Sequence, residues 1–252
     1  MRIGIVDPEL GPAGRYARRV LEKYARLEPH RAAVLEKNIV SYESHVRALL
    51  DKVLRRELDA GFVYRSDILK VADRVGNIRI PSACSVTPEY AMARLREAAV
   101  PRVAGAFMVW LLNPENEKIW RDYGFEPLEK AAAQLPPALA SGIGETADRA
   151  TGPLRVFAAA VFYDVLPVLA RRFSKSTGIE VECEFAGSGK LYHKILQGAV
   201  GECGADLFLS AAPRYVEELR TRGRADLTLV FMGNELIVVV GRGSGRAPDK
   251  NG

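Results

Sequence analysis

Short apolar runs alternate along this chain with longer segments in which apolar residues recur every three or four positions. The short runs are typical of buried strands, and the longer segments are typical of amphipathic helices. A chain that alternates the two in this way favours an α/β fold. We expect strands at 2–7, 59–65, 78–81, 154–160, 179–185, 205–211 and 235–241. We expect helices at 13–26, 44–55, 101–112, 114–122, 163–175, 190–198 and 213–222.

Two segments interrupt this alternation. Residues 128–152 are rich in Ala, Gly and Pro and show no sustained period, which predicts a linker with one short helical turn. Residues 241–252 end the chain with GRGSGRAPDKNG and are expected to form a mobile tail. The chain has 252 residues, 48% of them hydrophobic, and this is enough for two modest lobes or one large domain.

The charge balance is mixed rather than one-sided. Lys and Arg number 36 against 31 Asp and Glu, and both signs share the helical segment 15–37. This pattern predicts solvated helix faces and no nucleic-acid partner. No apolar run approaches the ~18 residues needed to span a bilayer. Met1 leads directly into an apolar strand, so we expect no signal peptide in this chain.

Residue types that bind metals or carry catalysis lack the spacing that such sites need. Cys84, Cys183 and Cys203 cannot all pair with one another, and no two of them have C-x-x-C spacing. Cys183 alternates with glutamates along a strand, which predicts a small hydrophobe on its buried face. The three histidines are scattered, and no Ser-His-Asp or paired-carboxylate set can be assembled. The sequence therefore indicates neither an enzyme, a metal centre nor a cofactor.

The stretch FAGSGK, residues 185–190, is similar to a phosphate-binding loop at first sight. A Walker A loop needs a first Gly where this chain has Glu184 and a Ser or Thr where it has Leu191. These departures argue against a nucleotide site, but a Gly-Ser-Gly turn at a helix N-terminus still offers free N–H groups to an anion. For this loop alone, the simpler interpretation is that Ser188 caps its own helix.

Three junctions share one design, a strand followed by a turn of small residues and then a helix. They are LRVFAAAVFYD, FAGSGKLY and DPELGPAGRYARRV, and a fourth helix start lies in SYESHVRALL, where Ser41 or Ser44 could act as the cap. Small residues at such turns let a ligand approach the free N–H groups of the helix. Four helix N-termini at one crevice would bind an anion. The alternative is four ordinary turns of an α/β protein, and periodicity does not decide between them.

A resemblance to a known family covers nearly all of the chain outside the linker and the tail. Residues 153–241, from PLRVFAAAVFYD through FAGSGKLY to NELIVVVG, resemble the first half of the molybdate- or tungstate-binding proteins of ABC transport systems. Residues 1–127 resemble the second half through the motifs DPE-x-x-PAG-x-YA, FVYRSD and YGFEP. The resemblance implies a two-lobed type II periplasmic-binding-protein fold in circularly permuted order, with the ligand cleft between the lobes. Residues 1–74 would form one lobe, and 75–127 with 153–240 the other.

The same resemblance implies a set of ligand-binding residues. Ser188 and Tyr64 would donate from their hydroxyl groups, and Ala13 and Val46 from their backbone N–H groups. The family commonly has Ser or Thr after the AAA run, where this chain has Val161, so an N–H group remains and a hydroxyl is lost. Tyr64 could equally be a core aromatic, and the resemblance favours the ligand role.

Basic side chains near these motifs are Lys190, Arg15 and Arg65. We expect them to be exposed, because long basic side chains keep their charge in water. A dry anion site can instead be satisfied by neutral N–H and O–H donors, without a buried Lys or Arg.

The functional expectation is a monomeric, non-enzymatic protein that binds molybdate or tungstate without a cofactor. The resemblance implies a membrane permease of an ABC importer as its partner and an extracytoplasmic location. A cytoplasmic oxyanion sensor or buffer is the alternative, and an enzyme is a distant third because no catalytic set can be assembled.

Overall fold

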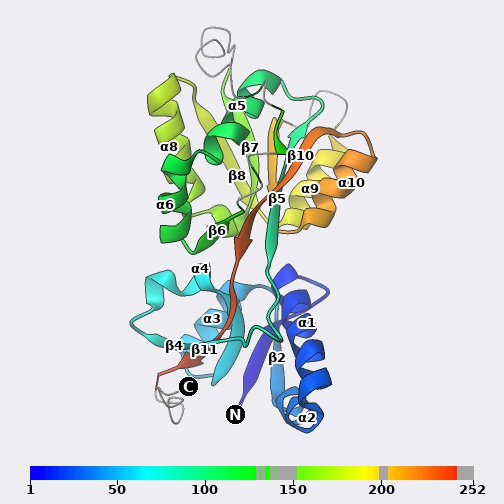
Figure 1. The fold of residues 1–252 in the computed structure, drawn as a ribbon, viewed down its shortest axis with the longest axis vertical. Coiled ribbons are helices and arrows are strands. Elements are labelled where there is room, and N and C mark those ends of the chain that lie inside the picture. The colour runs from blue at the N-terminus through cyan, green and yellow to red at the C-terminus, as the bar shows by residue number, and fades with distance from the viewer. Residues whose placement is uncertain (129–130, 132–133, 137–138, 140–151, 199–203, 243–252) are drawn as a thin grey trace. The chain divides into compact units, whose positions relative to one another are not determined.

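The computed structural model describes residues 1–252 apart from 129–130, 132–133, 137–138, 140–151, 199–203 and 243–252. The chain divides into two compact units. Unit 1 comprises Met1–Pro88 and Asn234–Gly252, and unit 2 comprises Glu89–Gly233 (Figure 1). The chain therefore passes from one unit to the other twice, after Pro88 and after Gly233.

Unit 1 contains a five-stranded sheet in the order β2-β1-β3-β11-β4. The apolar run AGFVY forms β3, which is buried at every position and pairs with β1 in parallel and with β11 in antiparallel orientation. The strands are β1 (Ile3–Val6), β2 (Ile39–Glu43), β3 (Ala60–Tyr64), β4 (Val75–Arg79) and β11 (Leu236–Gly241). The helices are α1 (Pro12–Leu27), α2 (Pro29–Lys37), α3 (Val46–Leu54), α4 (Arg65–Ile68) and the 3₁₀ helix η1 (Leu69–Val71).

Unit 2 contains a six-stranded sheet in the order β6-β10-β5-β9-β7-β8. Its core includes edge-to-face contacts of Trp120 with Phe125 and Phe162, which fix these rings beside the sheet. The strands are β5 (Glu89–Leu95), β6 (Phe125–Pro127), β7 (Leu154–Ala159), β8 (Val181–Ala186), β9 (Leu207–Ser210) and β10 (Ala225–Asn234). The helices are α5 (Pro101–Leu111), α6 (Pro114–Asp122), η4 (Ala160–Phe162), α8 (Leu166–Thr177), α9 (Ser188–Gln197) and α10 (Pro213–Thr221).

The two sheets repeat one pairing scheme. In unit 1, β1 pairs in parallel with β2 and β3, and β11 lies antiparallel between β3 and β4. In unit 2, β7 pairs in parallel with β8 and β9, and β5 lies antiparallel between β9 and β10. Each sheet therefore has four strands from one stretch of chain, 1–127 or 153–241, and receives one antiparallel strand, β11 or β5, from the other stretch. Strand β6 is an addition to unit 2.

Helix α1 packs unusually close to the turn that precedes it. A Cβ atom added to Gly14 would lie 2.2 Å from the carbonyl oxygen of Val6 and 2.7 Å from the nitrogen of Pro8. Both neighbours are backbone atoms, which cannot move aside as the end of a side chain can. A glycine is therefore required where α1 crosses the end of β1.

The boundaries between the units differ from those predicted. We expected one lobe to end at residue 74 and the other to include 75–127 and 153–240. The structure instead divides the chain after Pro88 and after Gly233. The reason is that β4 and β11 pair with each other, so both strands belong to the sheet of unit 1.

The predicted linker, 128–152, begins inside unit 2. Ala131 and Leu135 are buried in its core, and Leu128 packs against that core. The segment 140–151 lies outside the described residues, as do 243–252 of the predicted tail. The first part of the presumed linker is therefore anchored by apolar side chains.

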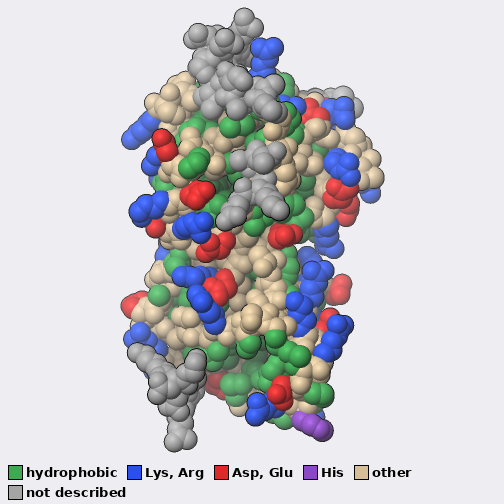
Figure 2. Space-filling model, in the orientation of Figure 1, with side chains coloured by type: hydrophobic (Ala, Val, Ile, Leu, Met, Phe, Trp, Pro, Cys, Tyr) green, Lys and Arg blue, Asp and Glu red, His purple; other side chains and the backbone are tan. Residues whose placement is uncertain are grey.

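One face of the molecule has the mixed charge that the sequence predicts (Figure 2). On the face drawn in Figure 2, basic and acidic side chains lie interspersed over both units. Typical pairs are Arg94 with Asp226 at 2.8 Å and Arg224 with Glu97 at 3.0 Å. Among the described side chains on this face, no broad area of a single sign that would attract a polyanion is seen (Figure 2).

Candidate functional site

In unit 1, the carboxyl end of β1 leads into helix α1. The residue before the helix is Gly11, which is extended and forms no side-chain cap, and Pro12 is the first helical residue. Ala13 is 2% exposed and follows at the second position. The N–H groups of a first helical turn have no acceptor within the helix, and Ala13 and Gly14 stand in this first turn of α1.

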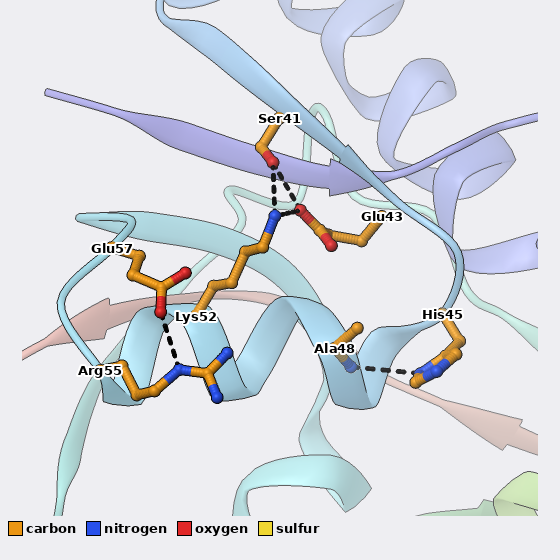
Figure 3. A network of polar contacts seen from close by, with 7 residues as sticks. All are labelled: Ser41, Glu43, His45, Ala48, Lys52, Arg55 and Glu57. Carbon is orange, nitrogen blue, oxygen red and sulfur yellow. Dashed lines mark hydrogen bonds and ion pairs between the residues drawn. The ribbon is translucent and has the colours of Figure 1, made fainter.

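The second turn of unit 1 joins β2 to α3 and is drawn in Figure 3. Its helix cap is His45, whose Nδ1 accepts a hydrogen bond from the N–H of Ala48 at 3.1 Å. Neither Ser41 nor Ser44, our predicted caps, has this role. Val46 is the first helical residue, and its N–H precedes the capped position.

The charges near this second turn are neutralised locally. Glu43 is buried, and its Oε1 accepts hydrogen bonds from Lys52 Nζ at 2.6 Å and from Ser41 Oγ (Figure 3). Burial alone would raise the pKa of Glu43, but the hydrogen bonds from Lys52 and Ser41 outweigh it and lower that pKa. The Lys52 ammonium is thus paired with a carboxylate, which leaves the neutral N–H groups of α3 as the donors of this turn.

The third turn of unit 1 follows β3, and Tyr64 is its last strand residue. Tyr64 is 4% exposed and belongs to the core of unit 1. Its N–H donates to Asp67 Oδ2 at 3.0 Å, which holds the turn closed. Next to it, Arg65 pairs with Glu235 at 3.2 Å, and Ser66 Oγ accepts a hydrogen bond from Asn234 Nδ2 at 2.9 Å.

The basic residues near the motifs are placed largely as expected. Lys190 is exposed, and so is Arg65, whose charge is paired with Glu235. Arg15 is half-buried, and its guanidinium donates to the carbonyl oxygen of Pro8 at 2.9 Å. This bond holds the loop before α1 and makes Arg15 a structural contact of the first turn.

Asp67 predicts a pH dependence of stability. Desolvation raises its pKa from 3.8 to about 7, against the N–H of Tyr64 and the charge of Arg47. Because the folded-state pKa is the higher one, this contribution to stability is fully present below about pH 4 and is lost as the pH rises through about 7. We expect Asp67→Asn to remove about 1 to 2 kcal/mol of the stability difference between about pH 5 and about pH 8. Urea unfolding of both proteins at the two pH values measures this difference. If the free energy of unfolding changes with pH by the same amount in both proteins, Asp67 is not the group responsible.

In unit 2, the turn after β7 carries Val161. It lies in the 3₁₀ helix η4, is half-buried, and packs against the core of unit 2. A valine side chain has no hydroxyl, so this turn can offer only backbone N–H groups.

The turn between β8 and α9 contains Ser188, the first residue of the helix. Gly187 precedes it and forms no side-chain cap. Ser188 is 9% exposed, and its Oγ accepts a hydrogen bond from the N–H of Ala211 at 2.9 Å. The interpretation that Ser188 caps its own helix is therefore wrong. A hydroxyl that accepts one hydrogen bond keeps its own O–H group for donation.

The third turn of unit 2 follows β9 and was missed in the sequence. Ser210 is fully buried. Its Oγ donates a hydrogen bond to the carbonyl oxygen of Ala212 at 2.8 Å and accepts one from the N–H of Ala212 at 3.1 Å. The string LFLSAAP ahead of a helix was the available signal, because Ser commonly bonds to backbone groups two residues later.

The turns at the starts of α1, α3, η4 and α9 share one chemistry, since each has the neutral N–H groups of a helix start, and Ser188 adds an O–H group. Such donors suit an anion. Among the described residues, no group of three or more His, Cys, Asp or Glu side chains could hold a metal ion. In the same part of the chain, no helix has the length and apolar character needed to cross a bilayer.

Neutral donors at the ends of strands are typical of a protein that binds a solute. Residues 1–126 and 154–251 match the family described as bacterial extracellular solute-binding protein, and the chain belongs to this family. The matched residues include parts of both units and the two points, after Pro88 and after Gly233, where the chain passes from one unit to the other.

Curated relatives narrow the comparison. The molybdate-binding protein ModA of Mycobacterium tuberculosis (strain ATCC 25618 / H37Rv) is 33% identical over 125 residues, which cover 50% of this chain and 44% of ModA. ModA of Escherichia coli (strain K12) is 31% identical over 109 residues, which cover 42% and 41%. The chain thus spans less than half the length of these relatives. The resemblance to molybdate-binding proteins is confirmed.

A solved structure supports the fold. The phosphate-binding protein of a phosphate ABC transporter from Streptococcus pneumoniae TIGR4 matches with a TM-score of 0.55 and 12% identity. The match covers 96% of this chain and 89% of that protein. The type II periplasmic-binding-protein fold is therefore confirmed.

Proposed function

We propose that this chain is the substrate-binding component of an ABC importer and that its ligand is a tetrahedral metal oxyanion, molybdate or tungstate. Family membership and the two ModA relatives support the class of ligand. The single observation that carries the proposal is Ser188, whose Oγ is held by the N–H of Ala211 while its O–H group can donate.

The proposed ligand set has five residues. Ser188 and Tyr64 would donate through hydroxyl groups, and Ala13, Val46 and Val161 through backbone N–H groups. A dianion that leaves water must exchange its hydration shell for other donors, because a buried charge without partners costs several kcal/mol. Neutral donors supply this exchange without placing a second charge in the site.

The proposed partner is a membrane permease, and the proposed location is extracytoplasmic. The family description, which names extracellular solute-binding proteins, supports the location. The partner is what the resemblance to the binding proteins of ABC transport systems implies. A monomer suffices for this role, since one chain contains all of the proposed donors.

The proposed function predicts stabilisation by the ligand. We expect molybdate or tungstate at 100 times its dissociation constant to add about 2.7 kcal/mol to the free energy of unfolding. Thermal melts with each ion, with sulfate and phosphate as matched tetrahedral controls, measure this effect. If neither metal oxyanion shifts the melting temperature at millimolar concentration, the proposed ligand is wrong.

We also propose that the two halves of the chain stand in the reverse order to those of the molybdate-binding relatives. The repeated pairing scheme supports this, because exchanging the order of the two stretches leaves each sheet unchanged. The two ends of the described chain also meet. Arg2 N donates to Asp59 Oδ2 at 2.6 Å, and Gly241 N donates to the carbonyl oxygen of Asp59 at 3.1 Å.

This order predicts that the chain can be rearranged. A protein that begins at residue 153, continues to 242, and is joined by a short Gly/Ser linker to residues 1–127 should fold with a similar melting temperature. Such rearrangements are tolerated where the joined ends lie close together. Thermal melts and oxyanion titration of both arrangements compare them. A rearranged chain that cannot fold would count against the proposal.

A further inference from the structure

The pairing scheme occurs once in each unit, with β1, β2 and β3 in one repeat and β7, β8 and β9 in the other. These two repeats place residues of the proposed site at corresponding positions. Val46 is the first residue of α3 and Ser188 the first residue of α9, and each helix follows the second strand of its repeat. Tyr64 is the last residue of β3, the third strand of its repeat. The corresponding last residue of β9 is Ser210, for which the sequence assigned no role.

Ser210 is built into its turn on both sides. The side chain is fully buried, and its Oγ forms one hydrogen bond to the carbonyl oxygen of Ala212 and one from the N–H of the same residue. Both bonds span two residues, so they fix the backbone of Ala211 between them. The hydroxyl uses its donor in this turn and so cannot also donate to a ligand.

The backbone of Ala211, which Ser210 fixes, contacts Ser188. The N–H of Ala211 donates to Ser188 Oγ at 2.9 Å, and this bond joins the third turn of unit 2 to the second. A serine hydroxyl can otherwise rotate among three staggered positions. By filling an acceptor position on Ser188 Oγ, the Ala211 N–H restricts where the O–H group can point.

We propose that Ser210 is a positioning residue of the anion site, which acts on Ser188 through the backbone N–H of Ala211. The inference rests on the proposed function, in which Ser188 donates to the oxyanion. Ser210 itself does not contact the ligand. Its role is to keep the donor of Ser188 oriented before the anion arrives, which lowers the ordering cost of binding.

The test compares variants that remove or keep the hydroxyl. Ser210→Ala should lower molybdate or tungstate affinity about tenfold, as expected for about 1.4 kcal/mol. Ser210→Cys, which nearly keeps the volume but forms only weak hydrogen bonds, should behave in the same way and serves if the alanine variant does not fold. Ser210→Thr keeps the hydroxyl and should retain most of the affinity. The matched control is Ser176→Ala, which removes a serine bond to the carbonyl oxygen of Phe173 in α8.

A double-mutant cycle separates positioning from general loss of stability. In a Ser188→Ala background, Ser210→Ala should change the calorimetric affinity by less than about twofold, because the group that it positions is gone. Equal losses in both backgrounds would overturn the inference.

A measurement without ligand distinguishes this inference from the proposed function. Amide hydrogen exchange of Ala211 should accelerate in Ser210→Ala and in Ser188→Ala, and not in Ser176→Ala. If the unchanged protein binds no oxyanion, the proposed function fails, and the exchange rates alone decide whether Ser210 fixes the turn. Unchanged Ala211 exchange in Ser210→Ala would overturn the positioning role.

Discussion

Replacing Ser188 with alanine should weaken molybdate or tungstate binding by a factor of about ten to more than a hundred. The expected size follows from the loss of a hydrogen bond to a charged partner, worth roughly 1.5 to 3 kcal/mol. Tyr64→Phe should have an effect of similar size, and it keeps the ring that packs in the core of unit 1. Isothermal titration calorimetry of each variant measures the change.

Two controls accompany the Ser188 and Tyr64 variants, one for loss of a nearby charge and one for loss of stability. Lys190 is exposed two residues after Ser188, and Lys190→Ala should change affinity by less than about threefold, since only a screened charge is lost. Ser188→Ala also leaves the N–H of Ala211 without its acceptor, so melts without ligand are needed to record any loss of stability. Unchanged affinity in the Ser188 or Tyr64 variant would return that residue to a structural role.

Gly14→Ala should destabilise unit 1 by about 3 kcal/mol or more, above the usual cost of an added methyl group in a packed region. The new Cβ would lie 2.2 Å from the carbonyl oxygen of Val6 and 2.8 Å from the carbonyl carbon of Asp7. Relief requires α1 to move away from β1, which would also displace the N–H of Ala13. Urea unfolding measures the loss of stability, and titration of the folded fraction measures the loss of affinity.

The matched control is Gly152→Ala. A Cβ at Gly152 would meet no heavy atom of the described residues within 4 Å, so its effect on the free energy of unfolding should stay within about 0.5 kcal/mol. If Gly14→Ala is as stable as this control, the close approach of α1 to β1 is wrong.

The strands that the sequence predicted well are those with continuous apolar runs. β3 and β11 were found because AGFVY and LIVVV leave little choice for a segment buried on both faces. β5 was missed because EYAMARL is composed largely of residues that favour helices. It forms a strand because it pairs with β9 and β10, and such partners are not visible in local composition.

The residues of the candidate site also divide into those with a local sequence signal and those that depend on distant contacts. The turns that contain Ser188 and Ala13 were predictable, since small residues between a strand and a helix have a local signature. The cap of α3 was not, because His45 is a rare capping residue beside two serines. Ser210 was not identified because its proposed role depends on a bond between two turns, which joins residues 23 positions apart in the chain.

Each sheet contains one strand from the other stretch of chain, β11 in unit 1 and β5 in unit 2. This arrangement sets the order in which the two sheets can be completed during synthesis. β11, the last described strand, lies between β3 and β4 in unit 1, so β4 has no partner in that sheet until β11 leaves the ribosome. Unit 2 receives β5 before the rest of its strands are made and can close first. We therefore expect nascent chains that stop before residue 236 to expose the apolar edge of β3, and to depend on a chaperone until the final strand is released.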